Sequence, residues 1–132
     1  MAGGEYGAST GRPRRVGPID LVATRYGCRI QGATEVALTK LDVLSYMKEI
    51  PVCTQYEVNG EKTDDFPFTA VIDKAKPVLT TVPGWGCDIS GVRKYEDLPQ
   101  AARDYVEYVE QAIGVHISYV SVGAGRDEII YR

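Results

Sequence analysis

The stretch DLPQAARDYVEYVEQAIGVHISYVSVGAG at residues 97–125 decides the fold class, because it predicts a helix, a strand and a glycine loop in direct succession. Apolar residues recur every three or four positions over residues 97–113, which predicts an amphipathic helix. Asp97 can cap that helix and Gly114 can end it. Residues 115–122 alternate between apolar and polar side chains, as a half-buried strand does. A helix that leads directly into a strand is typical of α/β and α+β proteins.

Upstream, the sequence predicts a second amphipathic helix over residues 19–31, with Gly32 as its stop. A short apolar run at residues 36–39 predicts a buried strand that ends at Lys40. Asn59-Gly60 is a strong signal for a two-residue hairpin turn. Further strands are expected at residues 51–58, 61–63, 77–82 and 129–131. We therefore predict an α/β fold in which a mixed sheet has flanking helices.

Composition and charge exclude several functional classes. The chain has 132 residues, of which 44% are hydrophobic and 25% charged, as in an ordinary soluble globular domain. It contains no apolar run long enough to cross a membrane. Its three cysteines are far apart and His116 is its single histidine, so neither a metal site nor a catalytic histidine is expected. The net charge is −3, yet residues 1–40 carry six basic and three acidic side chains, which indicates a focused anion site and no nucleic-acid surface.

Residues 3–18 are predicted to form a loop, because glycines and prolines interrupt every regular period. Its central segment is GASTGRPRR at residues 7–15, where glycines let the backbone approach a ligand and two hydroxyl side chains add donors. Arg12 and Arg14 should point to one side of an extended chain, where their guanidinium groups can bind carboxylates or phosphates. A solvated basic turn is the alternative.

Two further segments lie where predicted strands end. One is TKLD at residues 39–42, in which the Asp42 carboxylate can accept from two guanine N–H donors that adenine does not offer together. The aliphatic part of Lys40 can lie along a purine ring. The other is the glycine loop SVGAG at residues 121–125, at the kind of strand end where open α/β sheets bind ligands. An exposed strand end and an ordinary tight turn are the respective alternatives.

Taken in this order, the segments resemble the adenylosuccinate synthetase family over nearly the whole chain. The resemblance rests on GEYGASTGRPRRVG at 4–17, ALTKLDVL at 37–44, VPGW at 82–85, DISGVR at 88–93, EDLPQAARDYV at 96–106 and SVGAGRDE at 121–128. Members of that family join IMP to L-aspartate with GTP and Mg²⁺, giving adenylosuccinate, GDP and phosphate in purine biosynthesis. The resemblance implies the C-terminal part of a larger, P-loop-NTPase-like nucleotide-binding fold that works as a cytoplasmic homodimer.

The resemblance also implies a role for each matching residue. Residues 1–18 would be the substrate-binding arginine loop, and residues 19–132 the α/β region that carries the guanine-recognition elements. The residues that would bind aspartate and IMP are Ser9, Thr10, Gly11, Arg12 and Arg14. The residues that would bind GTP are Arg14 near the phosphates and, around the guanine, Lys40, Leu41, Asp42, Ser121, Val122 and Gly123.

Two departures from the family pattern limit what this chain is expected to do by itself. Pro18 stands where family members commonly have an aromatic residue. The phosphate loop, the catalytic aspartate and histidine and the Mg²⁺ ligands of the family match nothing in this chain, so no catalytic residue is assigned. We expect a fragment that is inactive alone and that self-associates or contacts a partner through exposed sheet edges. A non-enzymatic guanine-nucleotide-binding module is the alternative, and an RNA-binding protein is disfavoured by the acidic charge.

Overall fold

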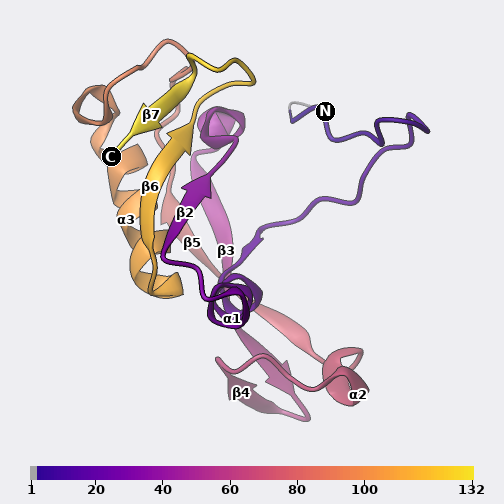
Figure 1. Ribbon diagram of the computed structural model, residues 1–132. Coiled ribbons are helices and arrows are strands. Elements are labelled where there is room, and N and C mark those ends of the chain that lie inside the picture. Colours follow the sequence, from indigo (N-terminus) through magenta and orange to yellow (C-terminus); the bar gives the residue numbers. More distant parts are fainter. Residues whose placement is uncertain (1–2) are drawn as a thin grey trace.

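Two β-sheets and two long helices form the body of the protein, and an irregular segment precedes them (Figure 1). The computed structural model describes residues 3–132. In the first sheet, the central strand β3 (Glu49–Val58) pairs with β1 (Ile19–Asp20), β4 (Glu61–Thr63) and β5 (Lys76–Pro83). The second sheet has the order β2 (Glu35–Leu38), β6 (His116–Ser121), β7 (Ile129–Tyr131). The helices are α1 (Leu21–Gln31), α2 (Thr69–Ile72) and α3 (Gln100–Ile113), with the short 3₁₀ helices η1 (Leu41–Tyr46) and η2 (Tyr95–Asp97).

Each sheet contains both parallel and antiparallel pairs. In the first, β1 runs parallel to β3, whereas β4 and β5 run antiparallel to it. In the second, β2 runs parallel to β6, and β7 runs antiparallel to β6. The predicted α/β class with mixed strands and flanking helices is confirmed, but the strands form two sheets where a single sheet was expected.

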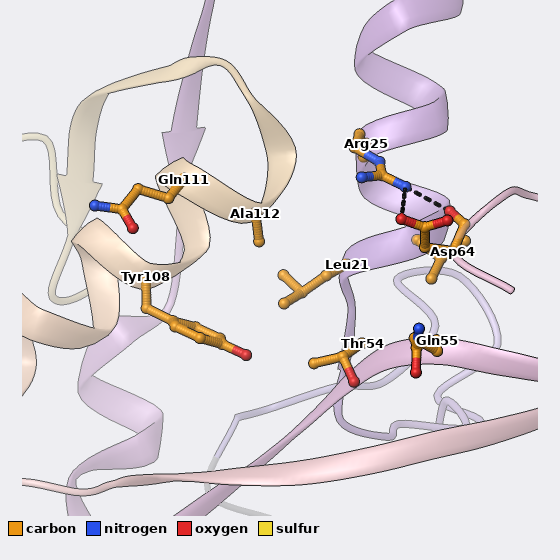
Figure 2. A pocket seen from close by; sticks show the side chains of 9 residues that line it. Leu21, Arg25, Thr54, Gln55, Asp64, Tyr108, Gln111 and Ala112 are labelled. Atoms are coloured by element: carbon orange, nitrogen blue, oxygen red, sulfur yellow. Dashed lines mark hydrogen bonds and ion pairs between the residues drawn. The ribbon is translucent and has the colours of Figure 1, made fainter. Parts of the chain in front are cut away.

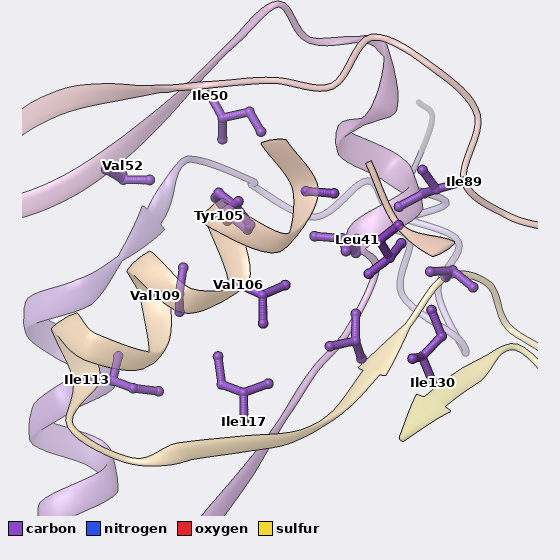
Figure 3. Packing of buried hydrophobic residues seen from close by; sticks show 14 of the residues in the cluster. Leu41, Ile50, Val52, Ile89, Tyr105, Val106, Val109, Ile113, Ile117 and Ile130 are labelled. Atoms are coloured by element: carbon purple, nitrogen blue, oxygen red, sulfur yellow. The ribbon is translucent and has the colours of Figure 1, made fainter. Parts of the chain in front are cut away.

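The main core lies around α3, which has the two sheets on either side of it (Figure 3). The buried residues of this helix are Ala102, Tyr105, Val106, Val109 and Ile113. They belong to one cluster with Ile50 and Val52 of β3 and with Ile117 and Val120 of β6. The apolar period of α3 therefore holds the two sheets together, as burial of one helix face against neighbouring elements requires.

α3 begins later than predicted but ends at the predicted residue. Asp97 does not cap the helix, because it lies in η2 and Pro99 occupies the N-cap position without a side-chain hydrogen bond. Gly114 ends the helix as predicted, with a left-handed φ of 71° that a glycine adopts without strain.

α1 begins two residues later than predicted, because Ile19 and Asp20 pair in parallel with β3. Asp20 then caps the helix: its Oδ1 accepts a hydrogen bond from the Ala23 N–H at 2.9 Å. Its Oδ2 accepts a second bond from the Tyr56 hydroxyl on β3. The expected apolar side of α1 is wrong at its C-terminal end, where Ile30 is 70% exposed.

β2 is an edge strand, which corrects the buried strand predicted for residues 36–39. Its exposed and half-buried residues alternate, because within the described residues only β6 borders it. The predicted hairpin is confirmed, since Asn59 and Gly60 have φ values of 54° and 84° and join β3 to β4. Positive φ at both positions matches the twist of the flanking strands.

Residues 3–18 contain no helix or strand, as predicted. Figure 1 shows this segment standing away from the body for most of its length before it enters β1. An isolated bridge pairs Tyr6 with Pro13, and the Gly7 N–H donates to the Arg12 carbonyl at 2.8 Å. The segment is thus folded back on itself into a narrow turn. Residues 1 and 2 of the predicted arginine loop lie outside the described part of the chain.

Candidate functional site

Lys40 is the point at which the three predicted recognition segments meet. Its backbone N–H donates to the Ser121 hydroxyl, with 3.2 Å between nitrogen and oxygen. Its Nζ donates to the Gly3 carbonyl at 2.9 Å and forms an ion pair with the Glu5 carboxylate. The parallel pairing of β2 and β6 explains the first contact, because the carboxyl ends of parallel strands reach the same edge of a sheet.

The backbone of Lys40 is left-handed, with φ 61° and ψ 34°. For a residue with a side chain this conformation costs roughly 1–2 kcal/mol, so the surrounding contacts must hold it. The turn directs the chain from β2 into η1 and buries the Leu41 side chain, which is 1% exposed. Leu41, which was predicted to bind GTP, can therefore offer a ligand only its backbone groups.

Asp42 lies in the first turn of η1 and is half-buried. Within residues 3–132, no cationic side chain forms an ion pair with its carboxylate. The carboxylate is thus not neutralised by a described cation, and it lies two positions along the chain from Lys40. A carboxylate in this state can accept two N–H donors from one edge of a flat ring.

Glu5 is part of this site although no sequence pattern singles it out. Its Oε1 pairs with Lys40, and its Oε2 lies 3.3 Å from Nη1 of Arg14. The hydrogen bond from Lys40 is the main cause that lowers the pKa of the Glu5 carboxyl, which is therefore charged at neutral pH. We call Glu5, Arg14, Lys40 and Ser121 the Lys40 cluster. Its ion pairs join positions nine and 35 residues apart, so no local pattern could have revealed them.

The rest of the arginine loop lies outside the Lys40 cluster. Ser9, Thr10, Gly11 and Arg12 are all exposed. The Arg12 N–H donates to the Thr10 hydroxyl at 3.4 Å, and Gly11 has a φ of 65° that suits glycine. The structure thus brings Arg14, Lys40 and Ser121 together and leaves the tip of the arginine loop facing solvent.

The loop after β6 is closed by the side chain of Glu128. The Gly125 N–H donates to the Glu128 carboxylate, and the Val122 N–H donates to the Glu128 carbonyl at 2.9 Å. A Cβ atom at Gly123 would overlap that carboxylate, so a side chain fits there only if Glu128 moves. Val122 itself is fully buried, and like Leu41 it has only backbone groups to offer a ligand.

Comparison with known proteins identifies the family of this chain. The family model described as adenylosuccinate synthetase matches residues 1–130. This chain belongs to the adenylosuccinate synthetase family. Among curated relatives, the adenylosuccinate synthetase of Mycolicibacterium smegmatis is 50% identical over 131 residues, and that of Bifidobacterium adolescentis is 49% identical over 129 residues. These alignments cover 98% and 97% of this chain but 30% of each relative.

A solved structure of an adenylosuccinate synthetase has the same fold over this region. The fully ligated enzyme from Plasmodium falciparum superposes with a TM-score of 0.93 at 32% sequence identity. The superposition covers 99% of this chain and 32% of that one. The chain therefore spans about a third or less of the length of the family members it matches.

One hollow of the described chain lies away from the family's matching motifs. It has a volume of about 460 Å³ and lies between α1, β3 and α3 (Figure 2). Its lining includes Leu21, Thr54 and Tyr108, together with the ion pair of Arg25 and Asp64. None of the residues that resemble the family's binding residues lines it. We place the candidate site at the Lys40 cluster, because the hollow lacks those residues and its one cation is already paired.

Neither a metal-ligand group nor a membrane-spanning helix is found among the described residues. Between residues 3 and 132, no three His, Cys, Asp or Glu side chains are grouped as ligands for a metal ion. The described residues therefore include no such ligand group for the Mg²⁺ that the family uses. No helix of the described chain is long and apolar enough to cross a membrane.

A second group of charges lies at the other end of β6. The Glu110 carboxylate of α3 accepts from the backbone N–H of Ile117 at 2.8 Å, from Arg132 and from Nδ1 of His116. We call Glu110, His116 and Arg132 the Glu110 cluster. The hydrogen bond from Arg132 is the main cause that lowers the pKa of Glu110 to about 2. His116 is thus engaged in a structural contact between α3 and β6.

Proposed function

We propose that this chain is the C-terminal part of an adenylosuccinate synthetase and supplies residues for guanine and aspartate recognition to the ligation of IMP with L-aspartate. The observation that carries this proposal is the meeting of the arginine loop, the TKLD segment and the glycine loop at Lys40. Its ligands would be GTP, L-aspartate and IMP, and the complete enzyme would be a cytoplasmic homodimer.

Guanine recognition is assigned to the two segments that follow β2 and β6. Asp42 would accept from the N1–H and the exocyclic amino group of guanine, which adenine cannot replace. The aliphatic part of Lys40 would lie along the ring, and Ser121 would fix the backbone at Lys40. The backbone groups of Leu41, Val122 and Gly123 complete this part of the site.

Aspartate and IMP recognition is assigned to the arginine loop. Arg12 and Arg14 carry guanidinium groups that can grip a carboxylate or a phosphate with two parallel hydrogen bonds. Ser9, Thr10 and Gly11 add hydroxyl and backbone donors in an exposed turn. Arg14 is the one residue of this set that also touches the Lys40 cluster, which fits its second role near the GTP phosphates.

The isolated chain should recognise its ligands without converting them. Its site offers no metal ligands among the described residues and no phosphate cradle, so GTP would be held at the base and not at the transferring phosphate. Affinity should therefore be weak, with a dissociation constant for GDP on the order of 1 mM. When Mg²⁺ is bound in the complete enzyme, it supplies charge neutralisation at the phosphates.

The test compares GDP with ADP as ligands of the chain, by NMR titration. Wild type should bind GDP several-fold more tightly than ADP, and Asp42→Asn should lose that preference. Asp73→Asn, an exposed and distant aspartate, is the matched control and should keep it. Equal affinity of wild type for GDP and ADP would refute guanine recognition. Micromolar binding would favour an independent guanine-nucleotide module instead.

Inactivity is tested separately. The chain is incubated with IMP, GTP, L-aspartate and Mg²⁺, and products are separated by chromatography and identified by mass. No adenylosuccinate should form. If it did form, the assignment of the chain to recognition alone would be wrong.

A further inference from the structure

We propose that Glu5 is a positioning residue that orders both halves of the recognition site before any ligand arrives. This proposal rests on the proposed function for the part that concerns ligands. Glu5 is not among the residues that resemble the family's binding residues, and we do not propose that it contacts a ligand. Its role would be to fix Lys40 and Arg14, which do.

The first contact fixes the guanine side of the site. Oε1 of Glu5 pairs with Nζ of Lys40, and the same Nζ donates to the Gly3 carbonyl at 2.9 Å. The side chain of Lys40 is still 49% exposed, so the ion pair with Glu5 is an important restraint on it. Without Glu5, the long lysine side chain would lose its one charged partner and sample many rotamers.

The second contact closes the arginine loop at its base. Oε2 of Glu5 lies 3.3 Å from Nη1 of Arg14, and the Arg14 N–H donates to the Glu5 carbonyl at 2.9 Å. Glu5 and Arg14 immediately flank the bridge between Tyr6 and Pro13. Both the side chain and the backbone of Glu5 therefore hold the two arms of this narrow turn together.

The exposure of the three side chains indicates which of them organises the group. Glu5 is 23% exposed, whereas Lys40 is 49% and Arg14 is 59% exposed. The two cations are thus open to ligands on their outer sides and share the one covered carboxylate between them. An ordinary surface pair would leave both partners mobile, but a carboxylate with one cation on each oxygen restrains both.

The restraint that Glu5 places on Lys40 should strengthen ligand binding, because it reduces the conformational entropy that the lysine side chain loses when a ligand binds. A ligand that meets a mobile Lys40 must immobilise it, which weakens affinity by roughly three- to ten-fold for one long side chain. With Glu5 in place, that cost is met when the protein folds. GDP binding should therefore depend on Glu5 even though GDP does not touch it.

The experiment uses the 132-residue chain, GDP as the probe and four single variants. Glu5→Gln removes the charge at the site, and Glu61→Gln removes the same charge on the exposed strand β4 as a control. Glu5→Asp keeps the charge but shortens its reach, so it should restore part of the wild-type behaviour. Lys40→Met supplies the background for a double-variant comparison.

Two readouts are expected to change in Glu5→Gln and not in Glu61→Gln. Without ligand, ¹⁵N relaxation should report greater mobility at Gly7 and Gly11, and the amide signals of Lys40 and Ser121 should shift. With ligand, the dissociation constant for GDP should rise about three- to ten-fold. In the Lys40→Met background the same glutamate substitution should raise the GDP constant by less than it does in wild type, because only the contact with Arg14 is left to lose, whereas a general loss of structure would be fully additive.

The proposal is overturned if loop mobility in Glu5→Gln equals that of wild type and the dissociation constant for GDP is also unchanged. It is overturned equally if loop mobility is unchanged and the effects of Glu5→Gln and Lys40→Met on that constant are fully additive. If wild type binds no GDP at all, guanine recognition by this chain fails. The relaxation measurements then decide the role of Glu5 by themselves, because they need no ligand.

Discussion

The Glu110 cluster and the Lys40 cluster use the same chemistry at opposite ends of β6. In each, one carboxylate is shared by two groups that carry or can carry a positive charge. Glu110 belongs to a helix and also accepts from the backbone of a strand, so it reinforces elements that already pack against each other. Glu5 lies in a segment without regular structure, where its ion pairs hold together parts that no core supports.

Similar ion pairs can therefore stabilise the fold in one place and position side chains for ligand binding in another. The two carboxylates are equally exposed, but Arg132 is 16% exposed whereas Lys40 and Arg14 are 49% and 59% exposed. Ion pairs with exposed cations contribute little to the free energy of unfolding. Variants should therefore separate the two ends of β6. The effects expected on stability fall in the order core, Glu110 cluster, loop junction, Lys40 cluster.

The largest effect is expected for Ile117→Ala, in the core between α3 and β6. Ile117 is fully buried, so the substitution removes apolar contacts and leaves a cavity. We expect a loss of about 2–5 kcal/mol in the free energy of unfolding, measured by chemical denaturation. Ile30→Ala, at a position 70% exposed, is the control and should change stability by no more than about 0.5 kcal/mol. Similar losses for both would mean that the core is not where the structure has it.

A smaller and pH-dependent effect is expected for Glu110→Gln. The pKa of Glu110 is about 2 in the folded chain against an ordinary 4.5. A lowered folded pKa stabilises the protein above pH 4.5, and this contribution is lost as the pH falls toward 2. The variant should thus be less stable than wild type by about 1–3 kcal/mol at pH 7.

The control for this prediction is Glu96→Gln, an exposed acid in η2. Its free energy of unfolding should follow that of wild type across the whole pH range. The gap between Glu110→Gln and wild type should narrow between pH 4.5 and 2. A gap that stays constant over this range would contradict the assigned ion pairs.

The junction between the arginine loop and the body should be weakened by Tyr56→Phe. The Tyr56 hydroxyl donates to Asp20, which caps α1 two residues after the loop ends. Removing it leaves one oxygen of a half-buried carboxylate without its donor and should cost about 0.5–1.5 kcal/mol. Tyr131→Phe, at a side chain 74% exposed, should leave the thermal midpoint unchanged. If the two variants melt alike, the Asp20 contact does not hold the junction.

The smallest effect on stability is expected for Glu5→Gln. Because its ion pairs lie at the surface, the midpoint of unfolding should not shift measurably. The mobility of the arginine loop should nevertheless rise. Glu110→Gln should do the opposite, lowering the free energy of unfolding and leaving the mobility of that loop unchanged. A clear drop in the midpoint would place Glu5 with Glu110 as a stabilising residue and remove the distinction between the two clusters.

The fold was predictable wherever local chemistry decides the backbone. The apolar period of α3, the stop at Gly114 and the Asn59-Gly60 turn all depend on neighbours in the sequence. The start of α1 was wrong because Ile19 and Asp20 are taken into a strand by β3, more than 30 residues away. The exposure of β2 was wrong because an apolar run does not reveal how many strands will border it.

The candidate site was predictable in its segments but not in its connections. Lys40 and Arg14 could be singled out because cations have an evident use in binding anions and bases, and Ser121 because its glycine loop resembles one of the family's segments. Glu5 could not, since an acid in a basic segment has no meaning until its two partners are brought beside it. The roles of the residues themselves remain predictions that the experiments above address.

The most direct test of the central claim is to map where GDP perturbs the backbone amides of the isolated chain. We expect the largest chemical-shift changes at residues 40–42 and 121–123, and smaller changes at Glu5 and Arg14. Signals lining the hollow between α1 and α3, such as those of Leu21 and Tyr108, should stay in place. Shifts confined to that hollow, with residues 40–42 unmoved, would contradict the assignment of guanine recognition to the Lys40 cluster.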